Sequence, residues 1–208
     1  MGARLYLRLC DHVRDGHLES ADVVFEAAGG LAAVYSGPVE TVVVFRGSGG
    51  GTWDDTLLNL WDDLSFRPTT EWQLHRGVLR HAQRIYEQTG LPEYVISQGR
   101  PVALTGMSLG GGAAALLPFW TRETLGPFKI VTFGSPLITK LPQEYSSALH
   151  SWGCSSIHNY VLRGDMLTNI PPFPGWSHVG PVSILPAVWG AEHQIDSYLD
   201  SLKDLNDA

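Results

Sequence analysis

The sequence has few cysteines and no long apolar run, and both shortages limit what the chain can be. It contains two cysteines, Cys10 and Cys154, for which one disulfide and two free thiols are equally consistent. No apolar run is long enough to span a membrane. Arg4 and Arg8 interrupt the apolar region that a signal peptide would need. We therefore expect no transmembrane segment, and the compartment stays open between the cytoplasm and a mature secreted form.

Positive charge is also scarce, because 14 lysines and arginines face 21 acidic residues. The net charge of −7 argues against a nucleic-acid partner and against tight binding to anionic membranes. A neutral lipid or ester substrate is compatible with this charge, as is transient binding to a lipid interface. Charged residues make up 17% and hydrophobic residues 44% of the chain, which is typical of a globular protein. The length of 208 residues predicts a single domain over 1–208, large enough to bury a core.

Motifs for phosphate and metal binding are missing as well. The glycine-rich stretch 47–52 looks like a phosphate-binding loop but has no lysine at the position where such a loop needs it. No metal-binding motif occurs either. We therefore expect neither a metal nor a cofactor.

The distribution of apolar residues predicts an α/β fold. Short runs over 22–27, 31–35 and 41–46, separated by glycine and proline turns, predict a meander of strands. Further strands then alternate with helices, which favours a mainly parallel central sheet with helices on both faces. These strands cover 101–104, 129–133 and 157–162, and the predicted helices cover 4–13, 73–88, 113–117 and 194–202. The inward faces are expected to carry Leu5, Leu9 and His12 on the first helix, and Ile195, Tyr198, Leu199 and Leu202 on the last.

The motif Gly106-Met107-Ser108-Leu109-Gly110 lies between a predicted strand and a predicted helix. Strand, tight turn and helix are the context of a nucleophile elbow, in which the glycines remove Cβ atoms from a sharp turn and the serine stands at its tip. At the N-terminus of a helix, Ser108 would lie where unpaired N–H groups favour developing negative charge. A glycine-rich turn with an incidental serine is the alternative.

A serine nucleophile needs a base and a carboxylate that orients the base. In the α/β-hydrolase arrangement the chain order is serine, acid, histidine, so only histidines after the acid qualify. Asp165 is the best acid, because it follows the strand 157–162 in a sharp turn, where an open α/β sheet places its site. An aspartate chosen for turn formation is the alternative. As the base we favour His193, in a loop before the last helix, over His178, which reads as the start of a strand.

The oxyanion of an acyl-transfer intermediate needs two N–H donors. Leu109, directly after Ser108, would supply one of them. Ser48, in the turn after the strand 41–46, would supply the other through its N–H or its hydroxyl. A Gly/Ser loop that merely turns is the alternative for Ser48.

Taken together, these stretches resemble the class 3 lipases, the fungal triglyceride-lipase-like family that also includes phospholipases A1 and feruloyl esterases. The resemblance covers most of the chain from about Val42 onward and rests on the segments 42–48, 59–66, 102–112, 131–136 and 159–172. It implies a triad of Ser108, Asp165 and His193 and an oxyanion hole of Ser48 and Leu109. The segment 176–180 is similar to a non-catalytic aromatic-x-His segment of the family, which supports His193 as the base.

The sequence departs from the family at two positions next to the expected site. Met107 stands where the family usually has histidine, and Thr168 replaces a common proline. The loop after Ser48 is also longer than in the fungal lipases. None of these departures removes a catalytic residue, but they leave the substrate preference open.

An amphipathic segment follows Ser48. Four aspartates lie mostly opposite an apolar stripe at helical spacing, whose members are Trp53, Leu57, Leu60, Trp61 and Leu64. The resemblance favours a helical lid over approximately 49–66 that covers the acyl site. A helix packed permanently on the core is the alternative.

The sequence thus predicts an α/β-hydrolase with a helical lid that acts as a serine carboxylic ester hydrolase. The expected substrates are acylglycerol-type or other lipid esters, cleaved through an acyl-enzyme intermediate. A phospholipase A1 or an esterase for soluble or aromatic esters is the first alternative, and a non-catalytic hydrolase-fold binding protein is the second.

Overall fold

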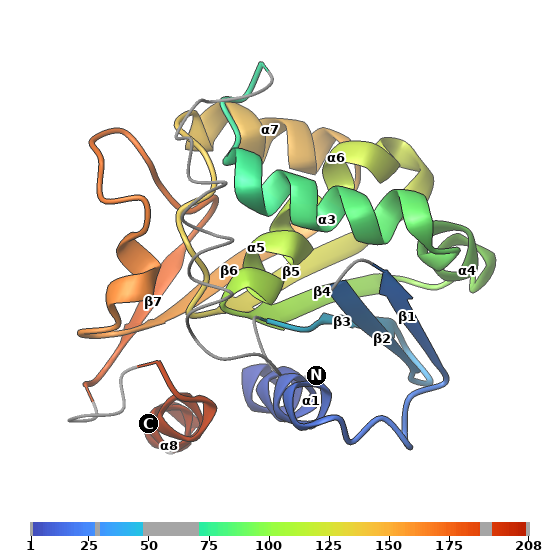
Figure 1. Cartoon of the computed structure of the whole chain (residues 1–208), viewed down its shortest axis with the longest axis horizontal. Helices are drawn as coiled ribbons and strands as arrows, with labels where there is room; N and C mark the ends of the chain where they lie inside the picture. Colours follow the sequence, from blue (N-terminus) through green and yellow to red (C-terminus); the bar gives the residue numbers. More distant parts are fainter. Residues whose placement is uncertain (1, 28–29, 48–70, 188–192, 207–208) are drawn as a thin grey trace.

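A computed structural model of the chain describes residues 2–27, 30–47, 71–187 and 193–206. Its centre is a seven-stranded sheet whose strands lie in sequence order from β1 to β7 (Figure 1). The strands are β1 (Val23–Ala27), β2 (Gly30–Ser36), β3 (Thr41–Phe45), β4 (Val102–Met107), β5 (Phe128–Phe133), β6 (Cys154–Leu162) and β7 (Val182–Leu185). β1, β2 and β3 pair antiparallel, whereas β3 to β7 pair parallel. The predicted meander and the mainly parallel sheet are confirmed.

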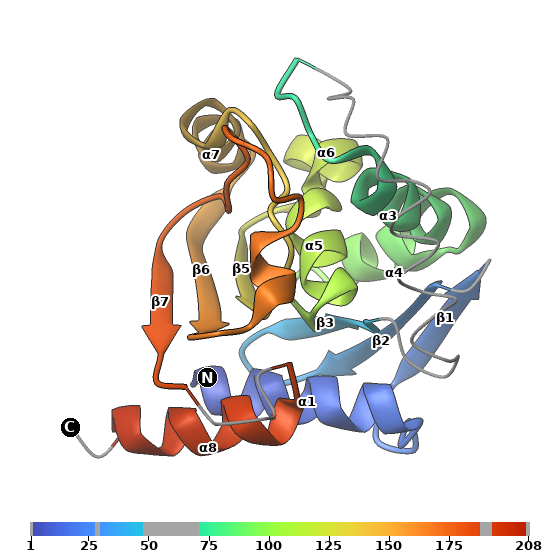
Figure 2. The same ribbon diagram turned by 60° about the vertical axis from the view of Figure 1, so that its left-hand side comes forward.

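Helices cover both faces of this sheet, as the alternating pattern predicts. α1 (Ala3–Asp15) and α8 (Ile195–Asn206) lie side by side on one face (Figures 1 and 2). The other face carries α3 (Arg76–Gln88), α4 (Leu91–Ser97), α5 (Leu109–Leu116), α6 (Pro118–Thr121) and α7 (Pro142–Ser151). Two 3-10 turns, η1 (Arg122–Leu125) and η2 (Met166–Asn169), lie in the loops. Within the described residues, no helix is both long and apolar enough to cross a membrane.

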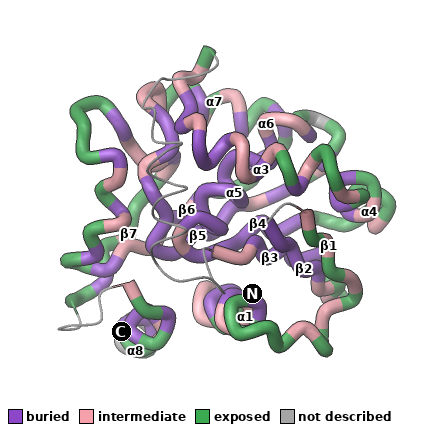
Figure 3. Tube along the Cα trace, in the orientation of Figure 1, coloured by how far each residue is buried: buried purple, intermediate pink, exposed green. Residues whose placement is uncertain are grey.

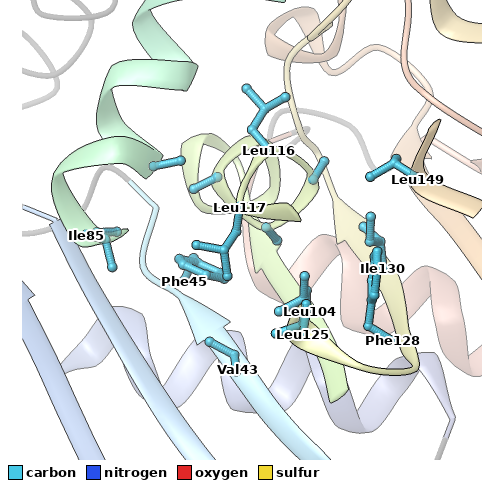
Figure 4. Close-up of a cluster of buried hydrophobic side chains, with 14 of the residues drawn as sticks. Val43, Phe45, Ile85, Leu104, Leu116, Leu117, Leu125, Phe128, Ile130 and Leu149 are labelled. Atoms are coloured by element: carbon cyan, nitrogen blue, oxygen red, sulfur yellow. The ribbon is translucent and has the colours of Figure 1, made fainter. Parts of the chain in front are cut away.

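The middle strands are buried on both faces, which explains their continuous apolar runs. Every residue of β3 and of β4 is buried. Above them, side chains from β3, β4 and β5 pack against α3 and α5 (Figure 4), among them Val43, Phe45, Leu104, Ile130, Ile85 and Leu116. Full burial of a side chain of this size contributes about 1.5–3 kcal/mol relative to exposure. This packing holds the strand ends, and with them the site, in a fixed arrangement.

The structure corrects the predicted inner face of α1. Tyr6, Leu7, Cys10 and Val13 are buried, whereas Leu5 is 42% exposed. The predicted stripe had the right spacing but was displaced by one residue. Tyr6 takes an inner position because its hydroxyl donates a hydrogen bond of 2.6 Å to the carboxylate of Glu40, so its ring can be buried without leaving a polar atom unpaired.

Three helices, α4, α6 and α7, and one strand were not predicted from the sequence. α4 has Pro92 in its first turn and α7 begins at Pro142. Proline suggests a loop, although the first positions of a helix tolerate it, because their N–H groups have no acceptor within the helix. β7 is only four residues long, too short for its pattern to stand out.

Both cysteines are free and buried, so the structure resolves the choice between a disulfide and two thiols in favour of thiols. Burial raises the pKa of Cys10 to about 12 and that of Cys154 to about 11. Because the thiolate is the reactive form, neither side chain is a nucleophile near neutral pH.

Candidate active site

Ser108 is the single residue that separates a strand from a helix. β4 ends at Met107 and α5 begins at Leu109. The backbone of Ser108 has φ 58° and ψ −132°, an unusual conformation for a residue with a Cβ atom that functional turns hold in place. Its N–H donates a hydrogen bond of 2.9 Å to the carbonyl of Phe133 at the end of β5. This is the strand–turn–helix geometry that the motif predicts.

The two glycines of the motif allow this turn to pack tightly. A Cβ atom on Gly106 would collide with the carbonyl group of Gly110, and a Cβ atom on Gly110 would collide with the backbone that follows β3. Side chains at these positions would therefore force the elbow open. The same contacts bring the end of β3, at Phe45 and Arg46, directly against the turn that carries Ser108.

Asp165 and His193 form a hydrogen-bonded pair at the carboxyl end of β6. The side chain of Asp165 is buried, and its Oδ2 lies 2.7 Å from Nδ1 of His193. Its Oδ1 accepts a hydrogen bond of 3.0 Å from the N–H of Leu167 in η2, so both carboxylate oxygens are held in place. Because an ionised carboxylate only accepts hydrogen bonds, Nδ1 of His193 carries a proton and Nε2 is the basic nitrogen.

Tyr198 is a member of this site that the sequence placed on an inner helix face but gave no role. From α8, its hydroxyl donates a hydrogen bond of 2.6 Å to Oδ2 of Asp165, the same oxygen that faces His193. It also accepts a hydrogen bond of 3.1 Å from the N–H of Leu162 at the end of β6. Burial, and then the charge of Asp165, raise the pKa of Tyr198, so the phenol stays protonated and remains a donor. Tyr198 therefore fixes the carboxylate between α8 and the sheet.

Gly134 lies at the point where the site residues meet. It follows Phe133, whose carbonyl holds Ser108, and its φ is +54°. A Cβ atom here would lie 2.9 Å from Tyr198 Oη, 3.1 Å from Asp165 Oδ2 and 3.2 Å from His193 Cε1. The backbone next to the elbow thus runs directly beneath the His193 ring. The structure brings Ser108, Asp165 and His193 to one place at the carboxyl edge of the sheet.

His178, the other candidate for the base, lies in the loop before β7 and not at the start of a strand, so that part of the prediction was wrong. In the part of the chain that the structure describes, the Asp165 carboxylate accepts from His193, Tyr198 and Leu167, and His178 is not among its donors. Burial lowers the pKa of His178, although a hydrogen bond with the backbone of Thr168 partly offsets this. The geometry favours His193 as the partner of Asp165.

The predicted oxyanion donors are only partly visible. Leu109 is the first residue of α5, so its N–H has no acceptor within the helix. Ser48 lies outside the described residues. The same is true of the predicted lid over 49–66, with its apolar residues Trp53, Leu57, Leu60 and Trp61. The roles of Ser48 and of the lid stay predictions.

The described geometry is suited to acyl transfer. It combines a half-buried serine at a tight turn, a histidine oriented by a buried carboxylate, and the N-terminus of a helix beside the serine. A histidine of this kind takes a proton from the serine and returns it to the leaving group. The positive end of the helix favours the negative charge that develops on the attacked oxygen.

Comparisons with known proteins agree with this geometry. The family model for the class 3 lipases matches residues 42–175, which is more than half of the chain. A comparison with curated proteins by sequence gave no match.

Solved structures of fungal lipases are similar over most of the chain. A triacylglyceride lipase of Rhizomucor miehei is 22% identical with a TM-score of 0.63, and the match covers 88% of this chain and 77% of that one. Lip2 lipase from Yarrowia lipolytica is 18% identical with a TM-score of 0.65 and the same coverage. A lipase from Rhizopus microsporus var. chinensis is 18% identical with a TM-score of 0.63, covering 88% of this chain and 72% of that one. The α/β-hydrolase fold is confirmed.

Proposed function

Because this chain belongs to the class 3 lipase family and is a serine ester hydrolase, we propose that it hydrolyses acylglycerol-type or related lipid esters through an acyl-enzyme on Ser108. The observation that carries this proposal is the 2.7 Å contact between His193 and Asp165 beside the turn of Ser108. Two further donors, the N–H of Leu167 and the hydroxyl of Tyr198, hold this buried carboxylate, an arrangement that suits an acid that orients a catalytic base.

In the proposed reaction, Oγ of Ser108 attacks the ester carbonyl carbon while Nε2 of His193 takes the hydroxyl proton. The tetrahedral intermediate collapses, the bond to the alcohol oxygen breaks, and His193 returns the proton to the departing alcohol. Water then attacks the acyl-enzyme in the same manner and releases the carboxylic acid, which restores Ser108. Asp165 holds the imidazole in the required tautomer and stabilises it when it is protonated.

The oxyanion would be stabilised by Leu109 and Ser48. The N–H of Leu109 supports this role because it opens α5 beside Ser108. Ser48 is proposed because it lies two residues beyond Arg46, and the backbone after β3 packs against the elbow. A second donor from this strand would complete the pair that the intermediate needs.

A profile of activity against acyl-chain length and substrate state tests the proposed substrate class. We expect p-nitrophenyl esters of medium-length acids to be cleaved faster than the acetate. We also expect the rate on a triacylglycerol to rise disproportionately once its concentration exceeds its solubility limit, which is the behaviour that the lid over 49–66 predicts. Ser108→Ala protein, purified in the same way, is the control for contaminating esterases.

The alternatives predict different results. Smooth saturation through the solubility limit with a preference for acetate or for aromatic esters would identify an esterase for soluble substrates. Faster release of the first acyl chain of phosphatidylcholine than of any acylglycerol chain would identify a phospholipase A1. Absence of hydrolysis with every ester would leave a binding protein and contradict the proposal.

A further inference from the structure

The chain between the proposed acid and the proposed base has an unusual composition. Residues 166–191, here called the uncharged segment, include no aspartate, glutamate, lysine or arginine in 26 consecutive positions. Charged residues nevertheless make up 17% of the whole chain. In the sequence, the segment begins directly after Asp165 and ends two residues before His193.

Several apolar side chains of the uncharged segment face solvent. Met166 is 82% exposed, Ile184 is 67% exposed and Val182 is 43% exposed. In Figure 3 the trace of β7 includes residues coloured as exposed, and Val182 and Ile184 are the exposed positions of this strand. Single exposed apolar residues are ordinary in soluble proteins, whereas a group of them close together on the surface indicates a contact site.

A cavity connects these side chains to the site. Its volume is about 320 Å³, and it is lined by Val182 and Ile184 of β7, by residues of η2 and by Asp165. Met166 lies in η2, directly after Asp165. Arg163 and His178 also line the cavity. Val182 and Ile184 therefore line one hollow beside the acid. Met166 belongs to the 3-10 turn that lines the same hollow through Thr168 and Asn169.

The backbone of β7 is poorly suited to pairing with another protein strand. β7 is the last strand of the sheet, and it lies between Pro181 and Pro186. Proline has no N–H to donate, and prolines at a sheet edge prevent the pairing of strands from different molecules. β7 can therefore contact a partner mainly through its apolar side chains. A hydrocarbon surface suits such a contact, because it offers no backbone groups for hydrogen bonding.

We propose that Met166, Val182 and Ile184 form a docking surface for an uncharged ester–water interface. This inference rests on the proposed function, because only a substrate that gathers at such an interface would give the surface a use. The net charge of −7 repels anionic headgroups. The uncharged segment offers no lysine or arginine to counter that repulsion, and Arg163 in the cavity lining contributes a single positive charge. Docking through η2 and β7 turns the edge of the sheet that holds Asp165 toward the lipid.

Insertion into a lipid film tests this surface without using activity as the readout. The probe is a monolayer of a dialkylglycerol ether, which has an uncharged headgroup and no ester bond to be cleaved. Wild-type protein injected beneath the film should raise its surface pressure. The double variant Met166→Ser/Ile184→Ser should need roughly a tenfold or greater concentration for the same rise, because it loses the transfer free energy of two apolar side chains.

Val39→Ser is the matched control. Val39 is 78% exposed but precedes β3, and so lies at the edge of the parallel strands opposite to Asp165. This variant should insert like the wild type. Thermal unfolding of every variant shows whether the fold is intact, and the single variant Ile184→Ser replaces the double variant if the latter does not fold.

The proposal is overturned if the folded double variant, or the single variant in its place, inserts into the film like the wild type. It is also overturned if Val39→Ser weakens insertion as much as the double variant does. A wild-type preference for a phosphatidylglycerol film over the neutral film also overturns it. A solution dimer that dissociates in the double variant, with film insertion unchanged, would assign the surface to a second copy of the chain. Hydrolysis of dissolved p-nitrophenyl butyrate by the wild type is measured in parallel. Absence of hydrolysis would contradict the proposed function, whereas the film measurement alone tests the docking surface.

Discussion

The Nδ1 atom of His193 lies 2.7 Å from Oδ2 of Asp165, although 28 positions separate the two residues in the sequence. The bond joins the carboxyl end of β6 to the loop before α8. Tyr198 reaches the same oxygen from within α8. The geometry of the proposed base therefore depends on how α8 packs against the sheet, and Figure 2 shows this helix beneath the arrowheads of β6 and β7.

Replacing Tyr198 with phenylalanine tests this dependence. Tyr198→Phe keeps the ring but removes the donor to Asp165 and the acceptor for the N–H of Leu162. We expect kcat to fall by about tenfold with little change in KM, because a hydrogen bond to a charged group contributes about 1.5–3 kcal/mol. The variant is assayed on a dissolved p-nitrophenyl ester after circular dichroism confirms its fold. An unchanged kcat would show that Tyr198 serves only to pack the core and does not position Asp165.

Gly134 provides a steric test of the same site. The added methyl of Gly134→Ala would lie 2.9 Å from Tyr198 Oη and 3.1 Å from Asp165 Oδ2, at a backbone φ of +54° that alanine rarely adopts. We expect a strong loss of activity together with a lower melting temperature. Gly126→Ala is the control for φ alone, because Gly126 has φ +75° with nothing within 4 Å of an added Cβ. Equal effects of the two variants on activity would refute a special role for Gly134.

The two candidate histidines are separated by their alanine variants. His193→Ala should reduce turnover about as much as loss of Ser108, because members of a triad act as one unit. His178→Ala should change stability more than chemistry, because His178 is not among the hydrogen-bond donors to the Asp165 carboxylate within the described residues. Initial rates and thermal unfolding of both proteins are compared. An inactive but folded His178→Ala protein beside an active His193→Ala protein would reverse the assignment.

His81 on α3 should make the fold sensitive to acid. Burial, followed by the charges of Arg84 and Arg46, lowers its pKa to about 4 from an ordinary value of about 6.5. The unfolded chain therefore binds a proton in a pH range where the folded chain does not. Stability from this source is complete above about pH 6.5 and is lost as the pH falls toward 4, by about 3 kcal/mol at most.

His81→Gln should remove this part of the pH dependence, because glutamine does not titrate. Urea unfolding at about pH 8 and about pH 4.5 measures it. The drop in the free energy of unfolding between the two pH values should be smaller in the variant than in the wild type. A drop of the same size in both proteins would show that other groups cause the acid sensitivity.

Local patterns in the sequence predicted much of the fold and part of the site. The elbow around Ser108 was predictable because its glycines, strand and helix are neighbours in the chain. Asp165 and His193 were predictable because catalytic order and the ends of strands restrict the candidates. The inner position of Tyr198 followed from helical spacing, but its bond to Asp165 did not, because a tyrosine in an apolar stripe looks like any other core residue.

Other features depend on contacts between distant segments, which a local pattern does not contain. The inner face of α1 was displaced by one residue, since the bond between Tyr6 and Glu40 spans 34 positions. Gly134 looked like an ordinary turn glycine until α8 and η2 were placed around it. The uncharged segment was visible in the sequence, but its meaning required the exposure of Met166 and Ile184.

The most direct test of the account is the covalent reaction of Ser108 with an organophosphate ester. Only an activated serine beside a base reacts readily with such a reagent. In the wild type, mass spectrometry should find one added phosphoryl group on the peptide that contains Ser108. Labelling should disappear in Ser108→Ala and fall sharply in His193→Ala. A label on a different serine in the wild type, or an undiminished label in His193→Ala, would contradict the proposed mechanism.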